Sequence, residues 1–189
     1  FILKKKWSEK TFELTASLTN KTVGIVGMGE IGKAFSKRVK SLSMKIVYFG
    51  PNKKNLKYKY FKNLKDMASV IDVMVITCIG GRKTKDLINK TIFKLMQPSS
   101  IIINVSRGSV INEVHLLAAL NKNLIGGAAL DVFEMEPKIN NKFLKLKNVL
   151  LSPHNGSATF ETREKMANIS SQNLLNFLYL KKLKNNVRC

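Results

Sequence analysis

Residues 23–32, with the sequence VGIVGMGEIG, are an apolar run that leads directly into the pattern Gly-x-Gly-x-x-Gly. A strand that ends in such a glycine turn passes the chain to a helix whose first backbone N–H groups have no partner within the helix. Those groups bind anions, and the pyrophosphate of a dinucleotide fits this arrangement. Three spaced glycines also occur by chance in many loops, so this prediction depends on the rest of the chain.

Strand and helix patterns alternate along the chain. Short apolar runs predict strands at residues 22–26, 45–49, 72–77, 100–105, 124–130 and 149–151. Helical periodicity predicts helices at residues 30–42, 63–70, 91–96, 113–120 and 159–180. This alternation predicts an α/β fold of the Rossmann type, a doubly wound parallel sheet covered on both faces. Ligands bind such sheets at the carboxyl ends of the strands, so the loops that follow the strands form the candidate site.

Composition sets limits on the function. The 189 residues are 44% hydrophobic, which is typical of a globular protein with one sizeable core. Lys and Arg number 33 against 12 Asp and Glu, so the formal charge is +21 and a polyanionic partner must be considered. The lysines are scattered among asparagines and isoleucines, and no helix-turn-helix, zinc or aromatic RNA-binding signature accompanies them. We therefore do not predict a nucleic-acid partner.

Targeting signals and cysteine usage point to a reducing compartment. The two cysteines, Cys78 and Cys189, give neither a disulfide framework nor a metal-ligand spacing, so no metal site is predicted. No secretory signal begins the chain and no run of eighteen apolar residues occurs, so we expect no membrane association and a cytoplasmic location.

The end of the second predicted strand indicates the choice of cofactor. Dinucleotide folds usually carry Asp or Glu there to accept from the adenosine ribose hydroxyls, but this chain has Gly50, followed by Asn52 and Lys53. Removing the acid removes repulsion of a 2′-phosphate, and nearby ammonium groups attract it. We expect NADP(H) to be preferred over NAD(H). The alternative that these lysines belong to the general lysine background stays open.

Two later loops carry residues suited to acid–base and carboxylate chemistry. Arg107 follows a buried strand beside Gly108, where it can form paired hydrogen bonds with a substrate carboxylate or, alternatively, pair with a loop carboxylate of the protein. His154 follows the last strand, and Glu136 lies eighteen residues before it. A carboxylate that bonds one imidazole nitrogen leaves the other free for proton transfer. The second histidine, His115, is expected on a helix surface.

Four motifs in this order carry a resemblance to the D-isomer-specific 2-hydroxyacid dehydrogenase family. They are Gly-x-Gly-x-x-Gly at 27–32, Asn-Val-Ser-Arg-Gly at 104–108, Leu-Asp-Val-Phe-x-x-Glu-Pro at 130–137 and Pro-His-x-Gly-Ser-Ala-Thr at 153–159. The resemblance covers about residues 18–178. Residues 156–163, the Cys-x-Gly-Gly turn and the missing second-strand acid look most like glyoxylate/hydroxypyruvate reductases and 2-ketogluconate reductases.

The resemblance implies NAD(P)H-dependent reduction of a small 2-oxo acid to the D-2-hydroxy acid. In that reaction Arg107 would bind the substrate carboxylate, His154 would exchange the proton, and Glu136 would pair with the imidazole. The family is typically dimeric through this domain, so a homodimer is expected. With the loop at Gly50, the expected cofactor contacts are Gly27, Gly29, Glu30, Ile31, Gly32, Gly50, Asn52, Lys53, Cys78, Ile79, Val105, Ser106, Arg107, Asp131, His154 and Gly156.

Family members insert this cofactor domain into a substrate domain, most of which has no counterpart in these residues. We expect a fragment, with a lead-in remnant at 1–18, the dinucleotide-binding domain at 19–157 and a helix at 158–189 that returns toward the absent domain. Activity of such a chain alone should be weak, because a closed cleft needs both lobes. Two alternatives stay open: a dinucleotide-sensing binding module of the corepressor type, and a phosphoglycerate dehydrogenase-like enzyme.

Overall fold

The computed structural model describes residues 2–11, 14–180 and 185. It divides into two compact units, Phe1–Ser152 and Pro153–Cys189, each of which is considered by itself. The expected end of the dinucleotide-binding domain, residue 157, lies within the second unit. Those parts of the expected segments 1–18 and 158–189 that fall on residues 1, 12–13, 181–184 and 186–189 lie outside the described residues.

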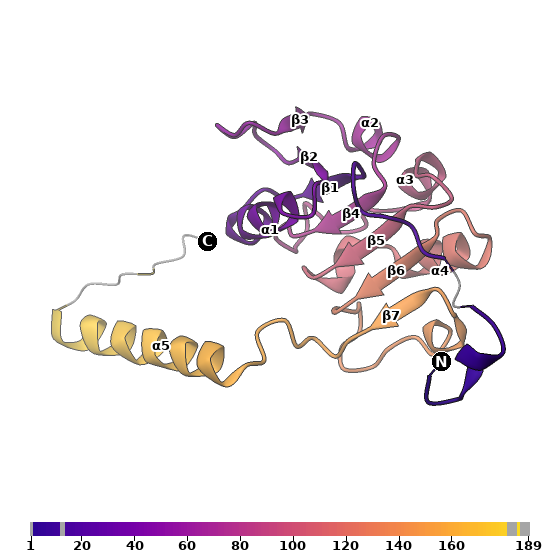
Figure 1. The fold of residues 1–189 in the computed structure, drawn as a ribbon. Coiled ribbons are helices and arrows are strands. Elements are labelled where there is room, and N and C mark those ends of the chain that lie inside the picture. Colours follow the sequence, from indigo (N-terminus) through magenta and orange to yellow (C-terminus); the bar gives the residue numbers. More distant parts are fainter. Residues whose placement is uncertain (1, 12–13, 181–184, 186–189) are drawn as a thin grey trace. The chain divides into compact units, whose positions relative to one another are not determined.

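Within the described residues the first unit holds a seven-stranded sheet in which every pairing is parallel. The strand order is β3-β2-β1-β4-β5-β6-β7, the doubly wound arrangement that the alternating pattern predicted (Figure 1). The strands are β1 (Thr22–Val26), β2 (Lys45–Phe49), β3 (Lys59–Phe61), β4 (Val73–Ile76), β5 (Ile101–Asn104), β6 (Gly127–Leu130) and β7 (Val149–Leu151).

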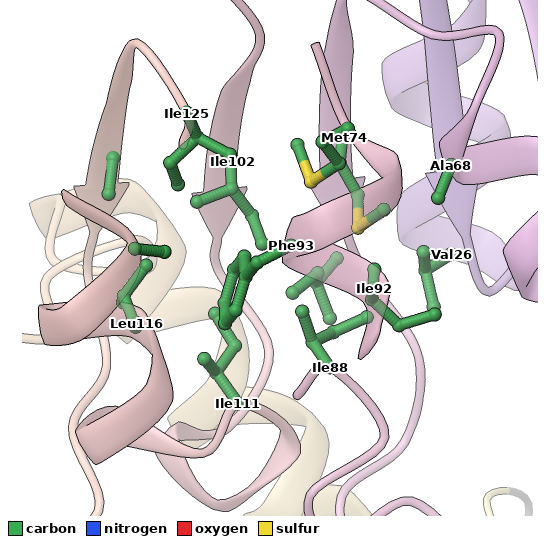
Figure 2. Packing of buried hydrophobic residues seen from close by; sticks show 14 of the residues in the cluster. Val26, Ala68, Met74, Ile88, Ile92, Phe93, Ile102, Ile111, Leu116 and Ile125 are labelled. Atoms are coloured by element: carbon green, nitrogen blue, oxygen red, sulfur yellow. The ribbon is translucent and has the colours of Figure 1, made fainter. Parts of the chain in front are cut away.

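Helices cover both faces of this sheet. The helices of the first unit are α1 (Glu30–Lys40), α2 (Leu64–Ala68), α3 (Lys90–Leu95) and α4 (Glu113–Asn121), with short 3-10 turns at Lys6–Ser8, Gly108–Val110 and Phe143–Lys145. Val39 and Phe35 of α1 pack with Val23 and Val75 on one face. On the other face α2, α3 and α4 contribute to the main core, where Phe93 lies among Ile88, Ile102 and Ile111 (Figure 2). Among the described residues of the second unit there is one helix, α5 (Phe160–Leu180).

Alternation along β1 explains why both faces are packed. Val23 and Ile25 point to the face of α1, while Gly24 and Val26 point to the face of the main core. A Cβ on Gly24 would come within 2.9 Å of the Ile71 side chain, so the glycine leaves room for the segment after α2 to pack on the strand. β1 and β4 are buried on both sides, and this explains their nearly continuous apolar sequence.

The main difference from the sequence interpretation lies between residues 52 and 70. β3 was not predicted, because its three residues are too few to show an alternating pattern within a lysine-rich stretch. The helix expected at 63–70 is the shorter α2, which begins after Asn63, whose side chain accepts a hydrogen bond from the Lys65 N–H at 2.9 Å. β3 therefore extends the sheet by one edge strand beyond β2.

Asp72, just before β4, ties the start of that strand to β1. Its carboxylate accepts from the Thr22 N–H at 2.8 Å and from Lys21 Nζ at 2.9 Å. Burial acts to raise the pKa of this carboxyl, but the bonds from Thr22 and Lys21 outweigh it and hold the pKa below its ordinary value of 3.8. A carboxyl whose pKa is lower in the folded state than in the unfolded state stabilises the fold at pH values above its unfolded-state pKa. This stabilisation is lost as the pH falls through its folded-state pKa.

We expect Asp72→Asn to lower the free energy of unfolding at neutral pH by about 1–2 kcal/mol, because charge-assisted bonds are lost. Urea denaturation at neutral pH and at about pH 3 would measure the difference between variant and parent. The difference should shrink in acid, where the parent loses the same contribution. A difference that stays constant or grows in acid would contradict this role of Asp72.

Candidate functional site at the carboxyl edge of the sheet

The glycine turn after β1 is held by close backbone contacts. Gly27 has a φ of 99°, a left-handed conformation that favours glycine, and its N–H donates to the Phe49 carbonyl at 2.9 Å. A Cβ at this position would lie 2.5 Å from Cys78 Cα. The Thr77 hydroxyl donates to the Gly27 carbonyl at 2.6 Å. The turn is thus fixed between the ends of β1, β2 and β4.

The N-terminus of α1 fits a phosphate group. Its N-cap residue, Gly29, provides no side-chain hydrogen bond, and a Cβ there would meet no atom within 4 Å. The backbone N–H groups of Glu30, Ile31 and Gly32 therefore begin an uncapped helix beside open space, which is the geometry that binds a pyrophosphate. The Glu30 side chain is exposed and pairs with Lys33 at 2.9 Å, and that hydrogen bond lowers the pKa of its carboxyl.

The loop after β2 is pinned at both ends by tyrosine hydroxyls. Tyr60 of β3 donates to the Gly50 carbonyl at 3.0 Å. Tyr48 accepts from the Lys54 N–H at 2.8 Å and donates to the Lys54 carbonyl at 3.2 Å. Between these points Asn52 and Lys53 are exposed. A Cβ on Gly50 would meet nothing within 4 Å, so the position usually held by an acid is open.

The loops after β4 and β5 touch each other. The Ser106 hydroxyl donates to the Cys78 carbonyl, which joins the two loops. Cys78 lies just beyond β4, and burial raises the pKa of its thiol. Ile79 is 88% exposed and Val105 is 40% exposed. These two side chains give the carboxyl edge an apolar surface suited to an aromatic ring of a cofactor.

Arg107 is positioned by a residue that the sequence interpretation did not select. Asn104, 1% exposed at the end of β5, accepts from the Ser106 N–H and donates to the Arg107 carbonyl, both at 3.0 Å. The guanidinium is exposed, and its Nη1 donates to the Ser106 carbonyl at 2.7 Å. A polar residue that ends an otherwise apolar strand was the signal that could have identified Asn104.

The loop of residues 131–137 packs directly on the loop of Arg107. A Cβ on Gly108 would overlap the backbone of Phe133, so only glycine permits this approach. The Glu136 carboxylate accepts from the Phe133 N–H at 2.8 Å, and Glu113 of α4 accepts from the Glu134 N–H at the same distance. Asp131 accepts a hydrogen bond from the Ser152 hydroxyl. The carboxylates of Glu136 and Glu113 therefore fix the backbone of residues 133 and 134.

His154 and Gly156 belong to the second unit, whereas Arg107 and Glu136 belong to the first. His154 has a φ of 50°, an uncommon left-handed conformation for a residue other than glycine. Such conformations cluster at functional sites. The Ala158 N–H donates to the Asn155 carbonyl at 2.9 Å, which closes the turn that follows His154. The meeting of the imidazole with Arg107 and Glu136 stays a prediction.

The first unit thus gathers the loops of Gly27, Gly50, Cys78, Arg107 and Glu136 at one edge of the sheet (Figure 1). These loops follow strands β1, β2, β4, β5 and β6. The edge combines an uncapped helix N-terminus, an open cationic corner, apolar side chains and a guanidinium. Those are the groups that bind a pyrophosphate, a ribose, an aromatic ring and a carboxylate.

Known proteins are similar to this chain in sequence and in fold. Residues 1–156 match the model of the D-isomer specific 2-hydroxyacid dehydrogenase NAD binding domain. The chain is 37% identical over 175 residues to a glyoxylate/hydroxypyruvate reductase of Arabidopsis thaliana, covering 92% of this chain and 56% of that protein. It is 39% identical over 176 residues to a 2-ketogluconate reductase of Gluconobacter oxydans, covering 93% and 57%.

A solved structure is also similar. The NADPH-dependent glyoxylate/hydroxypyruvate reductase of Sinorhizobium meliloti, in complex with NADP and malonate, has a TM-score of 0.93 and 32% sequence identity. The match covers 98% of this chain and 59% of that one, so the chain spans little more than half the length of these relatives. Among the described residues, no helix has the length and apolarity needed to cross a membrane. The chain belongs to the D-isomer specific 2-hydroxyacid dehydrogenase family, and it corresponds to the NAD-binding domain.

Proposed function

We propose that this chain is the cofactor-binding part of an NAD(P)H-dependent reductase that converts a small 2-oxo acid to the D-2-hydroxy acid. The observation that carries the proposal is the junction of two loops. Asn104 fixes the loop of Arg107, and Gly108 places that loop directly against the backbone held by Glu136. This junction supports a role for Arg107 as the carboxylate-binding cation and for Glu136 as the partner of the acid–base residue.

The residues have distinct roles in the proposed reaction. Reduced nicotinamide, when bound, supplies a hydride to the substrate C2. Arg107 binds the substrate carboxylate and stabilises the charge that develops on the carbonyl oxygen. His154 donates a proton to that oxygen, and Glu136 orients the imidazole. Ile79 and Val105, both exposed at the edge, shield one side of the reacting ring from water.

The relatives named as glyoxylate, hydroxypyruvate and 2-ketogluconate reductases indicate the substrates to try. For the test, the chain is joined to the N-terminal substrate lobe of a family member, and this chimera is called the lobe-completed protein. Oxidation of NADPH is followed by absorbance with glyoxylate, hydroxypyruvate and 2-ketogluconate in turn. We expect turnover with at least one of them. Dinucleotide binding without any turnover would instead favour the sensing module.

NADPH is the proposed preferred cofactor. The position after β2 is Gly50, and Lys53 stands exposed in a loop that two tyrosine hydroxyls hold in place. Residues 50–65, all of which the structure describes, include no Asp or Glu that would repel a 2′-phosphate, and an ammonium group attracts it. The homodimer and the cytoplasmic location expected from the sequence belong to the same proposal.

Gly50→Asp should reverse the cofactor preference. The new Cβ has open space, so the acid can reach the ribose hydroxyls without distorting the loop. We expect the Kd of NADPH to rise about ten-fold or more and the Kd of NADH to fall, measured by fluorescence titration of the chain. Lys53→Asp should act in the same direction. Equal changes for both dinucleotides would contradict the placement of the 2′-phosphate at this corner.

A further inference from the structure

We propose that Lys62, at the end of the edge strand β3, is a further determinant of cofactor specificity that contacts the 2′-phosphate of NADPH together with Lys53. This inference rests on the proposed function, because it assumes that the dinucleotide lies along the carboxyl edge of the sheet. It depends on the register of β3, a strand that the sequence pattern did not reveal.

The register places Lys62 level with Gly50. β2 and β3 are parallel, and Val47 pairs with Lys59, Tyr48 with Tyr60, and Phe49 with Phe61. The next pair in this register is Gly50 and Lys62, at a strand separation of about 4.8 Å. The Tyr60 hydroxyl donates to the Gly50 carbonyl at 3.0 Å, which ties β3 to the residue that follows β2. Lys62 therefore emerges at the carboxyl edge, beside the open position that the missing acid would occupy.

The chemistry of this corner suits a dianion. Residues 50–65 contain six lysines and no Asp or Glu. Lys53 lies on the loop after β2 and Lys62 directly follows β3, so both lie near the carboxyl ends of these two neighbouring strands. Lys62 is exposed, and neither of the two ion pairs found among the described residues, Lys21–Asp72 and Lys33–Glu30, includes it. Two ammonium groups around an open site stabilise a phosphate more than a hydroxyl.

The same strand provides a matched control. Lys59 is also an exposed lysine of β3, but it pairs with Val47, three residues before the edge, and its Nζ lies 4.8 Å from the centre of the Phe61 ring. Replacing either lysine by glutamine changes the net charge equally. A general effect of charge on a polyanionic cofactor would appear in both variants, whereas a direct contact would appear in only one.

The experiment titrates the 189-residue chain with NADPH and NADH by fluorescence, and with 2′,5′-ADP and 5′-AMP as competitors. Lys62→Gln should raise the Kd of NADPH and of 2′,5′-ADP about five-fold, with changes below about two-fold for NADH and 5′-AMP. Lys59→Gln should change every Kd by less than about two-fold, and Lys62→Arg should keep the preference. The effect of Lys62→Gln should decrease in about 0.5 M NaCl.

Equal effects of Lys62→Gln on NADPH and NADH, or an effect no larger than that of Lys59→Gln, would overturn the inference. A chain that prefers NADPH and responds to Gly50→Asp, but not to Lys62→Gln, would leave the proposed function standing without this contact. A chain that binds neither dinucleotide would refute both. The two failures are thus distinguishable in one set of titrations.

Discussion

His154→Ala in the lobe-completed protein is expected to lower kcat for 2-oxo acid reduction about a thousand-fold, because the carbonyl oxygen then receives no proton from a positioned acid. The Kd of NADPH should stay nearly unchanged, since the pyrophosphate and ribose contacts belong to other residues. The comparison of steady-state rates with dinucleotide titrations on the same samples would separate the two effects.

The other histidine of the chain gives the control. His115 lies in α4 of the first unit, half-buried, and its backbone N–H donates to the Asn112 side chain at the helix N-cap. His115→Ala also removes an imidazole, but from a position that has no role in the proposed reaction. We expect kcat within about two-fold of the parent. A full rate in His154→Ala, or an equal loss in His115→Ala, would refute the acid–base role of His154.

The second large effect is expected at the guanidinium. Arg107→Met should lower kcat/KM for the 2-oxo acid about a hundred-fold to a thousand-fold, because a paired, charge-assisted contact with the substrate carboxylate is lost. The loss should appear both as a higher KM for the oxo acid and as a lower kcat, because Arg107 is proposed to bind the carboxylate and to stabilise charge on the carbonyl oxygen, whereas the KM of NADPH should move little. Initial rates measured over a grid of both substrate concentrations would resolve the two constants.

Arg38→Met is the matched control for this substitution. Arg38 lies on α1, exposed, and its Nη1 donates to the Ala34 carbonyl at 2.9 Å, much as Arg107 donates to the carbonyl of Ser106. Added guanidinium ion should restore part of the rate in Arg107→Met and none in Arg38→Met. If Arg107→Met kept its kcat/KM, the arginine would have the structural role that its sequence context also allowed.

The sheet could be predicted from sequence because most of its strands are short apolar runs. β1, β2 and β7 have the bounds that the apolar runs predicted. The run of β1 is clear because a parallel strand buried on both faces needs apolar residues at nearly every position. Ends were less well predicted: β6 begins at Gly127, later than the apolar run suggests, because Asn123 takes a left-handed φ of 52° after α4.

The edge strand β3 and the side chains that bond backbone groups could not be predicted from the sequence, for a physical reason. β3 contributes few buried residues, so its lysines and tyrosines show no periodic pattern that distinguishes a strand from a loop. Asn104 bonds the backbone of the loop that follows it, and Glu113 bonds the backbone of the distant loop of residues 131–137. Such partners depend on how loops meet in three dimensions, which the identity of the residues alone does not give. The order of the motifs predicted which loops form the site, whereas only the structure shows the hydrogen bonds between these loops.

The central claim is that the Arg107 guanidinium and the His154 imidazole meet at one carboxylate-binding site beside the dinucleotide. A crystal structure of the lobe-completed protein with NADPH and oxamate, an unreactive 2-oxo acid analogue, tests it most directly. We predict that both side chains lie within about 3.5 Å of oxamate oxygens, with the pyrophosphate on the N-terminus of α1. Oxamate bound away from either side chain, or the two residues on opposite sides of the molecule, would contradict the account.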